Sequence, residues 1–232
     1  MNNTLDFWVT GASNGLGLAL VEQLLEGGHR VAASGRDSEA LDGLAKRYPQ
    51  QLLRVPGQLP LLEQAQAAAA SILRNWGGLD CLILNAGTCD YLADDLPEAE
   101  LFEAIVSTNL HASEHCLTSA LPLLVKRDAP QVMALLSRYS ALQLYSPTRM
   151  PSGANSTAQW LREQRQELQI LGVGLTLVAP QAMQSPASSA QAIPEQWTPE
   201  RTADELIRRL PQREPELVLE ALTLSNLWPL PR

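Results

Sequence analysis

The 232-residue sequence has few cysteines, few aromatic residues and no long apolar run. Its three cysteines, Cys81, Cys89 and Cys116, lack metal-binding spacing and cannot all pair within one chain, which favours a reducing, cytoplasmic setting. The longest uncharged apolar stretches, such as Gly172–Pro180, are far too short to cross a membrane. The first residues lack a basic segment followed by an apolar one, so we expect no secretory signal.

The chain also lacks an excess of positive charge. It has 17 Lys and Arg against 25 Asp and Glu, a net charge of −8, without a basic stripe or tail. Such a surface repels phosphate backbones, so we do not expect nucleic acid as a partner. Hydrophobic residues make up 45% of the chain, and neither a repeat nor a linker divides it. We therefore expect residues 1–232 to form a single domain.

Short apolar segments alternate with longer segments of helical periodicity, such as the stripe Leu16, Leu20 and Leu24. This alternation predicts an α/β fold: a doubly wound parallel sheet with helices on both faces. The expected strands are Phe7–Val9, Val31–Ala33, Leu52–Val55, Cys81–Leu84, Val132–Leu136 and Val173–Val178. The expected helices follow Gly15 and cover Ser38–Arg47, Leu61–Asn75, Glu98–Val125 and Thr157–Leu171, with a last one starting at Thr198-Pro199-Glu200. A Ser/Ala/Pro/Gln-rich segment at about 184–197 reads as a surface loop or a lid.

A glycine-rich segment, Thr10-Gly-Ala-Ser-Asn-Gly-Leu-Gly17, joins the first expected strand to the first helix. Glycines at 11, 15 and 17 allow a tight turn and let backbone N–H groups approach a pyrophosphate at the helix N-terminus. Glycines also mark ordinary turns, but the strand–loop–helix context favours a dinucleotide site.

With Leu84-Asn85-Ala86-Gly87 after the fourth strand, the sequence resembles the short-chain dehydrogenase/reductase family over about residues 5–210. The family pattern TGxxxGxG matches residues 10–17, and NNAG matches 84–87 with Leu84 as the one difference. The resemblance implies a Rossmann fold, NAD(P)(H) binding and hydride transfer between carbonyls and alcohols.

The resemblance also assigns roles to individual residues. The family's helical asparagine falls on Asn109, its strand-end serine on Ser137, and its PG motif on Pro180-Gln181. Ser137 and Asn109 are thus retained catalytic positions, although both can equally persist by satisfying buried polar groups. The implied cofactor-binding residues are Gly11, Ser13, Asn14, Gly15, Leu16, Gly17, Arg36, Gln58, Asn85, Ala86, Gly87 and Pro180.

The end of the second strand bears on cofactor choice. NAD-preferring members carry an aspartate where this chain has Gly35, so nothing at that point repels a 2′-phosphate, and Arg36 can pair with one. NADP(H) is therefore favoured over NAD(H); the alternative is that Arg36 is a solvated surface charge. Gln58 replaces a family aspartate that meets the adenine amine, and its oxygen can accept the same hydrogen bond.

The family's catalytic Tyr-x-x-x-Lys pair is missing. In the family the tyrosine, the acid or base, usually lies thirteen residues after the serine and about thirty before the proline of PG. Counts from Ser137 and from Pro180 both reach Met150, and the lysine position is Ala154. A thioether has no proton to donate, whereas a positioned general acid contributes about 10²–10⁴-fold. The sequence thus indicates a former active site.

The same stretch also predicts an altered helix start. Pro151 and Gly153 disfavour a helix interior, so we expect the helix to begin late, with Asn155 or Ser156 as its cap.

Other residues offer substitute chemistry. Tyr145 and Arg149 form a Tyr-x-x-x-Arg pair, which requires a loop five residues shorter after Ser137 and five residues regained before Pro180. Tyr139 lies too close to Ser137 along the chain to be a good substitute for the missing tyrosine. His111 and His115 have the i, i+4 spacing of metal ligands but no evident third ligand, so we expect no metal site. Cys89 lacks an obvious base partner.

Two main functions remain open. One is an NADP(H)-binding module without the usual chemistry, which acts as a regulator, sensor or partner of an active homologue. The other is an active but atypical oxidoreductase; a dehydratase or isomerase on the same scaffold has no motif in its favour. The substrate or protein partner is unknown. Family members often form homodimers or homotetramers through the segments at 98–125 and 155–171, the second of which is rich in charge here.

Overall fold

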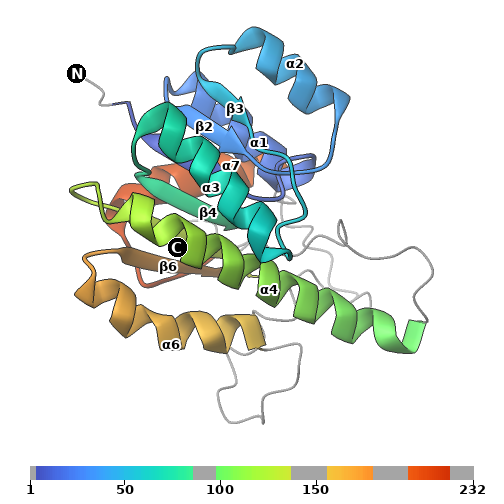
Figure 1. Cartoon of the computed structure of the whole chain (residues 1–232), viewed down its shortest axis with the longest axis vertical. Helices are drawn as coiled ribbons and strands as arrows, with labels where there is room; N and C mark the ends of the chain where they lie inside the picture. Colours follow the sequence, from blue (N-terminus) through green and yellow to red (C-terminus); the bar gives the residue numbers. More distant parts are fainter. Residues whose placement is uncertain (1–3, 86–97, 137–155, 180–197, 220–232) are drawn as a thin grey trace, which may run out of the picture.

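The computed structural model describes residues 4–85, 98–136, 156–179 and 198–219. Within these ranges seven strands form one parallel sheet in the order β3-β2-β1-β4-β5-β6-β7 (Figure 1). The strands are β1 (Asp6–Val9), β2 (Arg30–Ala33), β3 (Leu52–Arg54), β4 (Cys81–Asn85), β5 (Gln131–Leu135), β6 (Gly174–Ala179) and β7 (Glu216–Val218). The helices are α1 (Gly15–Glu26), α2 (Glu39–Arg47), α3 (Leu62–Trp76), α4 (Glu98–Leu124), α6 (Ser156–Ile170) and α7 (Pro199–Arg209), followed by a 3₁₀ turn, η2 (Leu210–Gln212).

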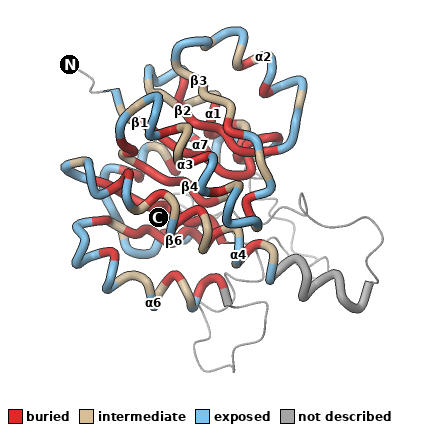
Figure 2. The backbone as a smooth tube through the Cα atoms, in the orientation of Figure 1, coloured by how far each residue is buried: buried red, intermediate tan, exposed pale blue. Residues whose placement is uncertain are grey.

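Helices cover both faces of the sheet, as the sequence predicts. One buried cluster joins the sheet to α3, α4 and α6, and a second joins it to α1, α2 and α7. Successive side chains of β1 alternate between the two: Trp8 belongs to the first cluster, Phe7 and Val9 to the second. Figure 2 shows the buried residues running through the strands and the inner sides of the helices. The predicted doubly wound α/β Rossmann fold is confirmed.

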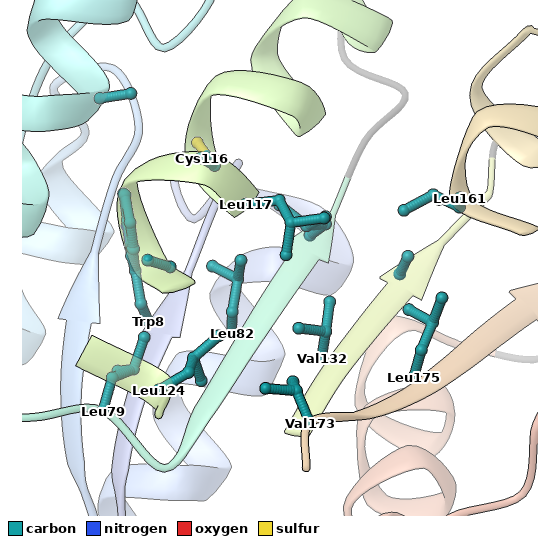
Figure 3. Packing of buried hydrophobic residues seen from close by; sticks show 14 of the residues in the cluster. Trp8, Leu79, Leu82, Cys116, Leu117, Leu124, Val132, Leu161, Val173 and Leu175 are labelled. Carbon is teal, nitrogen blue, oxygen red and sulfur yellow. The ribbon is translucent and has the colours of Figure 1, made fainter. Parts of the chain in front are cut away.

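The first cluster packs large aliphatic side chains against the central strands. Figure 3 shows Trp8 of β1, Leu82 of β4 and Val132 of β5 beneath residues of α4. The indole N–H of Trp8, which is fully buried, donates to the hydroxyl of Ser34 at 2.8 Å. This bond satisfies the one polar atom of the largest core side chain and fixes the residue that follows β2.

The strand order reverses between β1 and β4. The chain runs outward through β2 and β3, then crosses to β4 on the other side of β1 and continues outward to β7. In open parallel sheets this switch point leaves a crevice at the carboxyl ends of the two central strands. The glycine-rich segment leaves β1 at that edge, which makes it the place to look for a site.

Most element boundaries agree with the sequence to within one or two residues. Ser38 caps α2 by accepting from Leu41 N at 3.1 Å, and Thr198 caps α7 by accepting from Arg201 N at 3.3 Å. Gly27 ends α1, and Gly28 follows with a φ of 82° that favours glycine. Ser156 is the first residue of α6, so it is not the residue that precedes the helix as a cap; Asn155 lies outside the described residues.

The sequence does not predict β7. This three-residue edge strand pairs with β6 in the register Leu177 to Glu216 and buries Leu217 in the second cluster. Arg162 of α6 also forms an ion pair with Glu216 of β7, at 3.0 Å. One of the charged residues of α6 is therefore paired within the chain. No helix in the described ranges is both long and apolar enough to span a membrane.

A charge network centred on the buried Asp6 lies at the amino-terminal ends of the strands, opposite the glycine-rich segment. The side chain of Asp6, 2% exposed, accepts from Arg30 Nε at 2.6 Å and Arg30 Nη2 at 2.7 Å, and also from Arg127. Asp80 accepts from the backbone N–H of Asp6 at 2.8 Å, and the Arg30 guanidinium lies 5.2 Å from the ring centre of Trp76. This network ties the starts of three strands together, on the side of the sheet away from the glycine-rich segment.

Candidate functional site

The glycine-rich segment has the conformation that its glycines allow. Gly11 and Gly15 have φ angles of 63° and 51°, in the left-handed region that side-chain-bearing residues rarely adopt. Gly17 has a different reason to be glycine, because a Cβ there would lie 2.0 Å from the Gly11 carbonyl oxygen. The loop thus folds back onto the first turn of α1, as the sequence predicts for a tight turn.

Asn85, the last residue of β4, holds this loop in place. Its backbone N–H donates to Thr10 Oγ1 at 3.0 Å, and its side-chain amide donates to the Gly11 carbonyl oxygen at 3.1 Å. Asn85 is predicted as a cofactor-binding residue, and in the structure its amide positions the loop. Thr10 was not among the predicted site residues, but its hydroxyl accepts the hydrogen bond that joins β4 to the loop. Its position as the threonine of the TGxxxGxG pattern could have identified it from the sequence.

Among the described residues, no side chain caps the N-terminus of α1. The side-chain oxygen of Asn14, the residue before the helix, accepts no hydrogen bond from a backbone N–H of the first turn, and a Cβ on Gly15 would meet no described atom within 4 Å. Asn14 and Gly15 are exposed and Leu16 is half-buried. The first N–H groups of a helix carry partial positive charge and bind anions such as a pyrophosphate. The residues present therefore fit a dinucleotide at this position.

The end of β2 packs directly against the glycine loop. A Cβ added to Gly35 would lie 2.4 Å from Ser13 Oγ and 2.9 Å from the Ser13 backbone nitrogen. The Ser13 hydroxyl donates to the carbonyl oxygen of Arg36 at 3.0 Å. Position 35 therefore lacks a carboxylate because the loop leaves no room for any side chain there, which the sequence alone could not show.

Charges surround the predicted 2′-phosphate position. Arg36 is exposed, directly after Gly35. The next residue, Asp37, has a side chain that is 95% exposed and binds Arg54 at 3.1 Å. The expectation that nothing repels a phosphate concerned position 35 alone; at position 37, which it did not consider, a carboxylate is present and paired.

Gln58 lies in the turn between β3 and α3, and it is exposed. Its backbone N–H donates to Gln64 Oε1 at 2.8 Å, which steadies the turn. β3 is the outer neighbour of β2, so its carboxyl end belongs to the same edge of the sheet as the glycine loop.

Three of the polar residues of α4 that the sequence singles out have contacts within the chain, Asn109 through its backbone. Asn109 is 7% exposed, and its carbonyl oxygen accepts from the Ser113 hydroxyl at 2.8 Å. His115 Nδ1 lies 2.9 Å from the Pro60 carbonyl oxygen, and the His111 ring stacks on it with 6.0 Å between ring centres. Among the described residues there is no cluster of three or more His, Cys, Asp or Glu arranged to hold a metal.

Neither described cysteine is poised for reaction. Cys81 and Cys116 are buried, and burial raises the pKa of each thiol far above its ordinary value, so both stay protonated. They behave as small core residues.

Several predicted positions lie outside the described residues, including the retained serine and the proposed substitutes. These are Ala86, Gly87, Cys89, Ser137, Tyr139, Tyr145, Arg149, Met150, Ala154, Pro180 and the segment 184–197. The strands that precede two of them are described. β5 ends at Leu135 and β6 at Ala179, in the register Leu135 to Val178. Along the sequence, Ser137 follows the end of β5 by two residues and Pro180 follows the end of β6 by one.

Known proteins resemble this chain both in sequence and in three-dimensional structure. The family description "short chain dehydrogenase" matches residues 7–196. A cis-1,2-dihydrobenzene-1,2-diol dehydrogenase of Pseudomonas putida is 34% identical over 132 residues, which cover 55% of this chain. A cis-2,3-dihydrobiphenyl-2,3-diol dehydrogenase of Paraburkholderia xenovorans is 34% identical over 122 residues, covering 50% of this chain. The chain spans about half the length of these curated relatives, 48% and 44% respectively.

Solved structures share the fold across nearly the whole chain. L-sorbose reductase from Gluconobacter frateurii, complexed with NADPH and L-sorbose, has a TM-score of 0.72 at 17% identity and covers 96% of this chain and 97% of its own. A metagenomic short-chain oxidoreductase in complex with NADP has a TM-score of 0.69 at 22% identity, with 94% and 98% covered. Together with the glycine loop and its Asn85 support, the match over residues 7–196 means that the chain belongs to the short-chain dehydrogenase family.

Proposed function

We propose that this chain binds NADP(H) and that the hydride-transfer chemistry of its family is lost or altered in it. The observation that carries the proposal is the residue at position 150. Ungapped counts from Ser137 and from Pro180 both reach Met150, and Ala154 stands at the lysine position. Because β5 and β6 end two residues and one residue before these two anchors, the counts start from equivalent points of the sheet.

The cofactor half of the proposal is supported by the glycine loop. Gly11, Gly15 and Gly17 shape it, Asn85 supports it, and no described side chain caps the N-terminus of α1. The nicotinamide cofactor supplies a hydride donor or acceptor when bound, and the chain's own residues hold and orient it. A structural neighbour is complexed with NADPH and another with NADP, which is consistent with Arg36 as a partner for a 2′-phosphate.

The catalytic half follows from proton chemistry. Reduction of a carbonyl leaves an alkoxide that needs a proton, and oxidation of an alcohol needs a base. Met150 provides neither, and Ala154 provides no cation to lower the pKa of a neighbouring hydroxyl. A chain of this kind acts as a nucleotide-responsive regulator, sensor or partner of an active homologue.

The competing proposal is an active, atypical oxidoreductase. It uses the Ser137 hydroxyl with Tyr145 and Arg149, or a substrate reactive enough to need only positioning. The dihydrodiol dehydrogenases among the relatives suggest the class of substrate with which to test it.

A turnover assay separates the two proposals. The chain would be incubated with NADP⁺ or NAD⁺ and the cis-dihydrodiols of benzene and biphenyl, and with NADPH and a panel of ketones and ketoses. We expect nucleotide binding without turnover above the uncatalysed rate. Robust turnover would contradict the catalytic half, and Tyr145→Phe would then show whether that tyrosine is the acid. Unchanged turnover in Tyr145→Phe excludes it.

A further inference from the structure

We propose that Arg54 is a specificity-determining residue for the 2′-phosphate, which it favours by neutralising Asp37 rather than by binding the nucleotide. The inference rests on the proposed NADP(H) site and adds a residue that reduces the negative charge beside it. Arg54 belongs to none of the motifs that identify the family.

The geometry places Arg54 between two carboxylates. It is the last residue of β3, and its side chain is 22% exposed. Nη2 lies 3.1 Å from Asp37 Oδ1, and Nη1 donates to Asp42 Oδ1 in the first turn of α2. Each of the two terminal nitrogens therefore has its own carboxylate partner.

Position 37 makes this pairing relevant to the nucleotide. Asp37 directly follows Arg36 in the loop after β2, so the Cα atoms of the two residues are about 3.8 Å apart. An uncompensated carboxylate there would repel a phosphate that carries nearly two negative charges, and would also compete for the Arg36 guanidinium. With Arg54 bound to both Asp37 and Asp42, the three groups carry a net charge of −1 instead of the −2 that the two carboxylates would carry without it.

Discrimination follows because the two nucleotides differ only in that phosphate. NADH has a 2′-hydroxyl, which has no net charge, so its binding responds weakly to the charge at position 37. The binding of NADPH, which carries the charged 2′-phosphate, responds strongly to that charge. The role is one of positioning and charge compensation, since Arg54 acts through Asp37 and Arg36.

The experiment compares the Kd values of NADPH and NADH for the full chain and for Arg54→Gln, by calorimetry at low and at high salt. We expect Arg54→Gln to raise the Kd of NADPH roughly three- to tenfold and to leave that of NADH within about twofold. High salt should reduce the effect of Arg54→Gln on the Kd of NADPH, because salt screens exposed charges. Asp37→Asn added to Arg54→Gln should restore most of the NADPH affinity, since it removes the carboxylate that Arg54 compensates.

Arg47→Gln serves as the matched control. Arg47 also binds a carboxylate, Glu22, at 2.9 Å, but on the exposed side of α1 and α2. The Arg47→Gln substitution should change the Kd of neither NADPH nor NADH.

An equal loss of affinity for both nucleotides in Arg54→Gln, or no loss of affinity for either, would overturn the role of Arg54. Failure of the Asp37→Asn rescue would overturn it too. A wild-type chain that binds neither nucleotide would overturn the proposed function as well, and a wild-type chain that binds NADH alone would overturn the NADP(H) site.

Discussion

Gly35 packs against Ser13 so closely that a Cβ at position 35 would lie 2.4 Å from the serine hydroxyl and 2.9 Å from its backbone nitrogen. The residue that is an aspartate in NAD-preferring relatives is therefore constrained here by the shape of the glycine loop. The backbone contact matters most, because a hydroxyl can rotate away and a peptide nitrogen cannot.

Gly35→Asp should fail to convert the chain to NAD(H) use. We expect weaker binding of both nucleotides and a free energy of unfolding lower by about 1–3 kcal/mol, as for other overpacked sites. Calorimetry with NADH and NADPH, together with urea unfolding, would check this. Adding Ser13→Gly should recover only part of the stability, because the contact with the backbone nitrogen remains. Tighter NADH binding at wild-type stability would refute this account of the loop.

Gly17→Ala should disrupt the loop and the nucleotide site together. The added methyl group would approach the Gly11 oxygen to 2.0 Å and Asn85 Nδ2 to 2.7 Å, so the hydrogen bond between these groups cannot survive in place. Gly43→Ala in α2 is the control, since a Cβ there meets nothing within 4 Å and alanine gains about 0.5–1 kcal/mol in a helix. Thermal melting with and without NADPH would separate the two variants. Equal nucleotide-induced shifts in both would contradict the prediction.

Asp6→Asn should reduce stability and leave nucleotide binding unchanged. The substitution leaves Arg30 and Arg127 without their shared carboxylate. We expect a loss of about 3 kcal/mol, the low end for a broken buried pair, because the two arginine side chains keep 35% and 30% of their surface in water. Urea unfolding measures the loss. A change in the Kd of NADPH would show that the two edges of the sheet are coupled, contrary to this expectation.

His29 should make the chain less stable on mild acidification. Burial lowers the pKa of the ring below its ordinary 6.5, against a smaller opposing effect of Asp80, and Nδ1 accepts from the Leu5 backbone N–H at 3.2 Å. The unfolded chain therefore binds the proton first, so stability is full above pH 6.5 and falls as the pH drops toward the folded pKa. His29→Gln should lose this part of the pH dependence. The check is urea unfolding of both proteins from neutral pH to below 6.5; parallel curves would rule out His29 as the cause.

The sequence predicts the fold because its signals are local. Short apolar strands, amphipathic helices and capping residues such as Ser38 and Thr198 act within a few residues of themselves, and the structure confirms them. β7 was missed for the same reason: three residues with one buried side chain, between Pro215 and Leu219, are too few to show alternation. Its stability comes from pairing with β6, which lies far away in the sequence.

The site was predictable as a motif but not as a set of contacts. The glycines at 11, 15 and 17 could be assigned from their spacing. The close packing of Gly35 on Ser13 and the pairing of Arg54 with Asp37 could not, because each joins different strands or loops through space. The same holds for Asp6 and Arg127, which are 121 positions apart.

The fluorescence of NADPH bound to the full chain, followed before and after a panel of carbonyl compounds is added, tests the central claim most directly. Binding changes the emission of the reduced nicotinamide, and oxidation abolishes it. The account predicts a saturable change on binding and a constant signal afterwards, because Arg36 and the glycine loop hold the nucleotide while Met150 and Ala154 supply no acid. A rapid loss of emission with any member of the panel, or no binding at millimolar nucleotide, would contradict it.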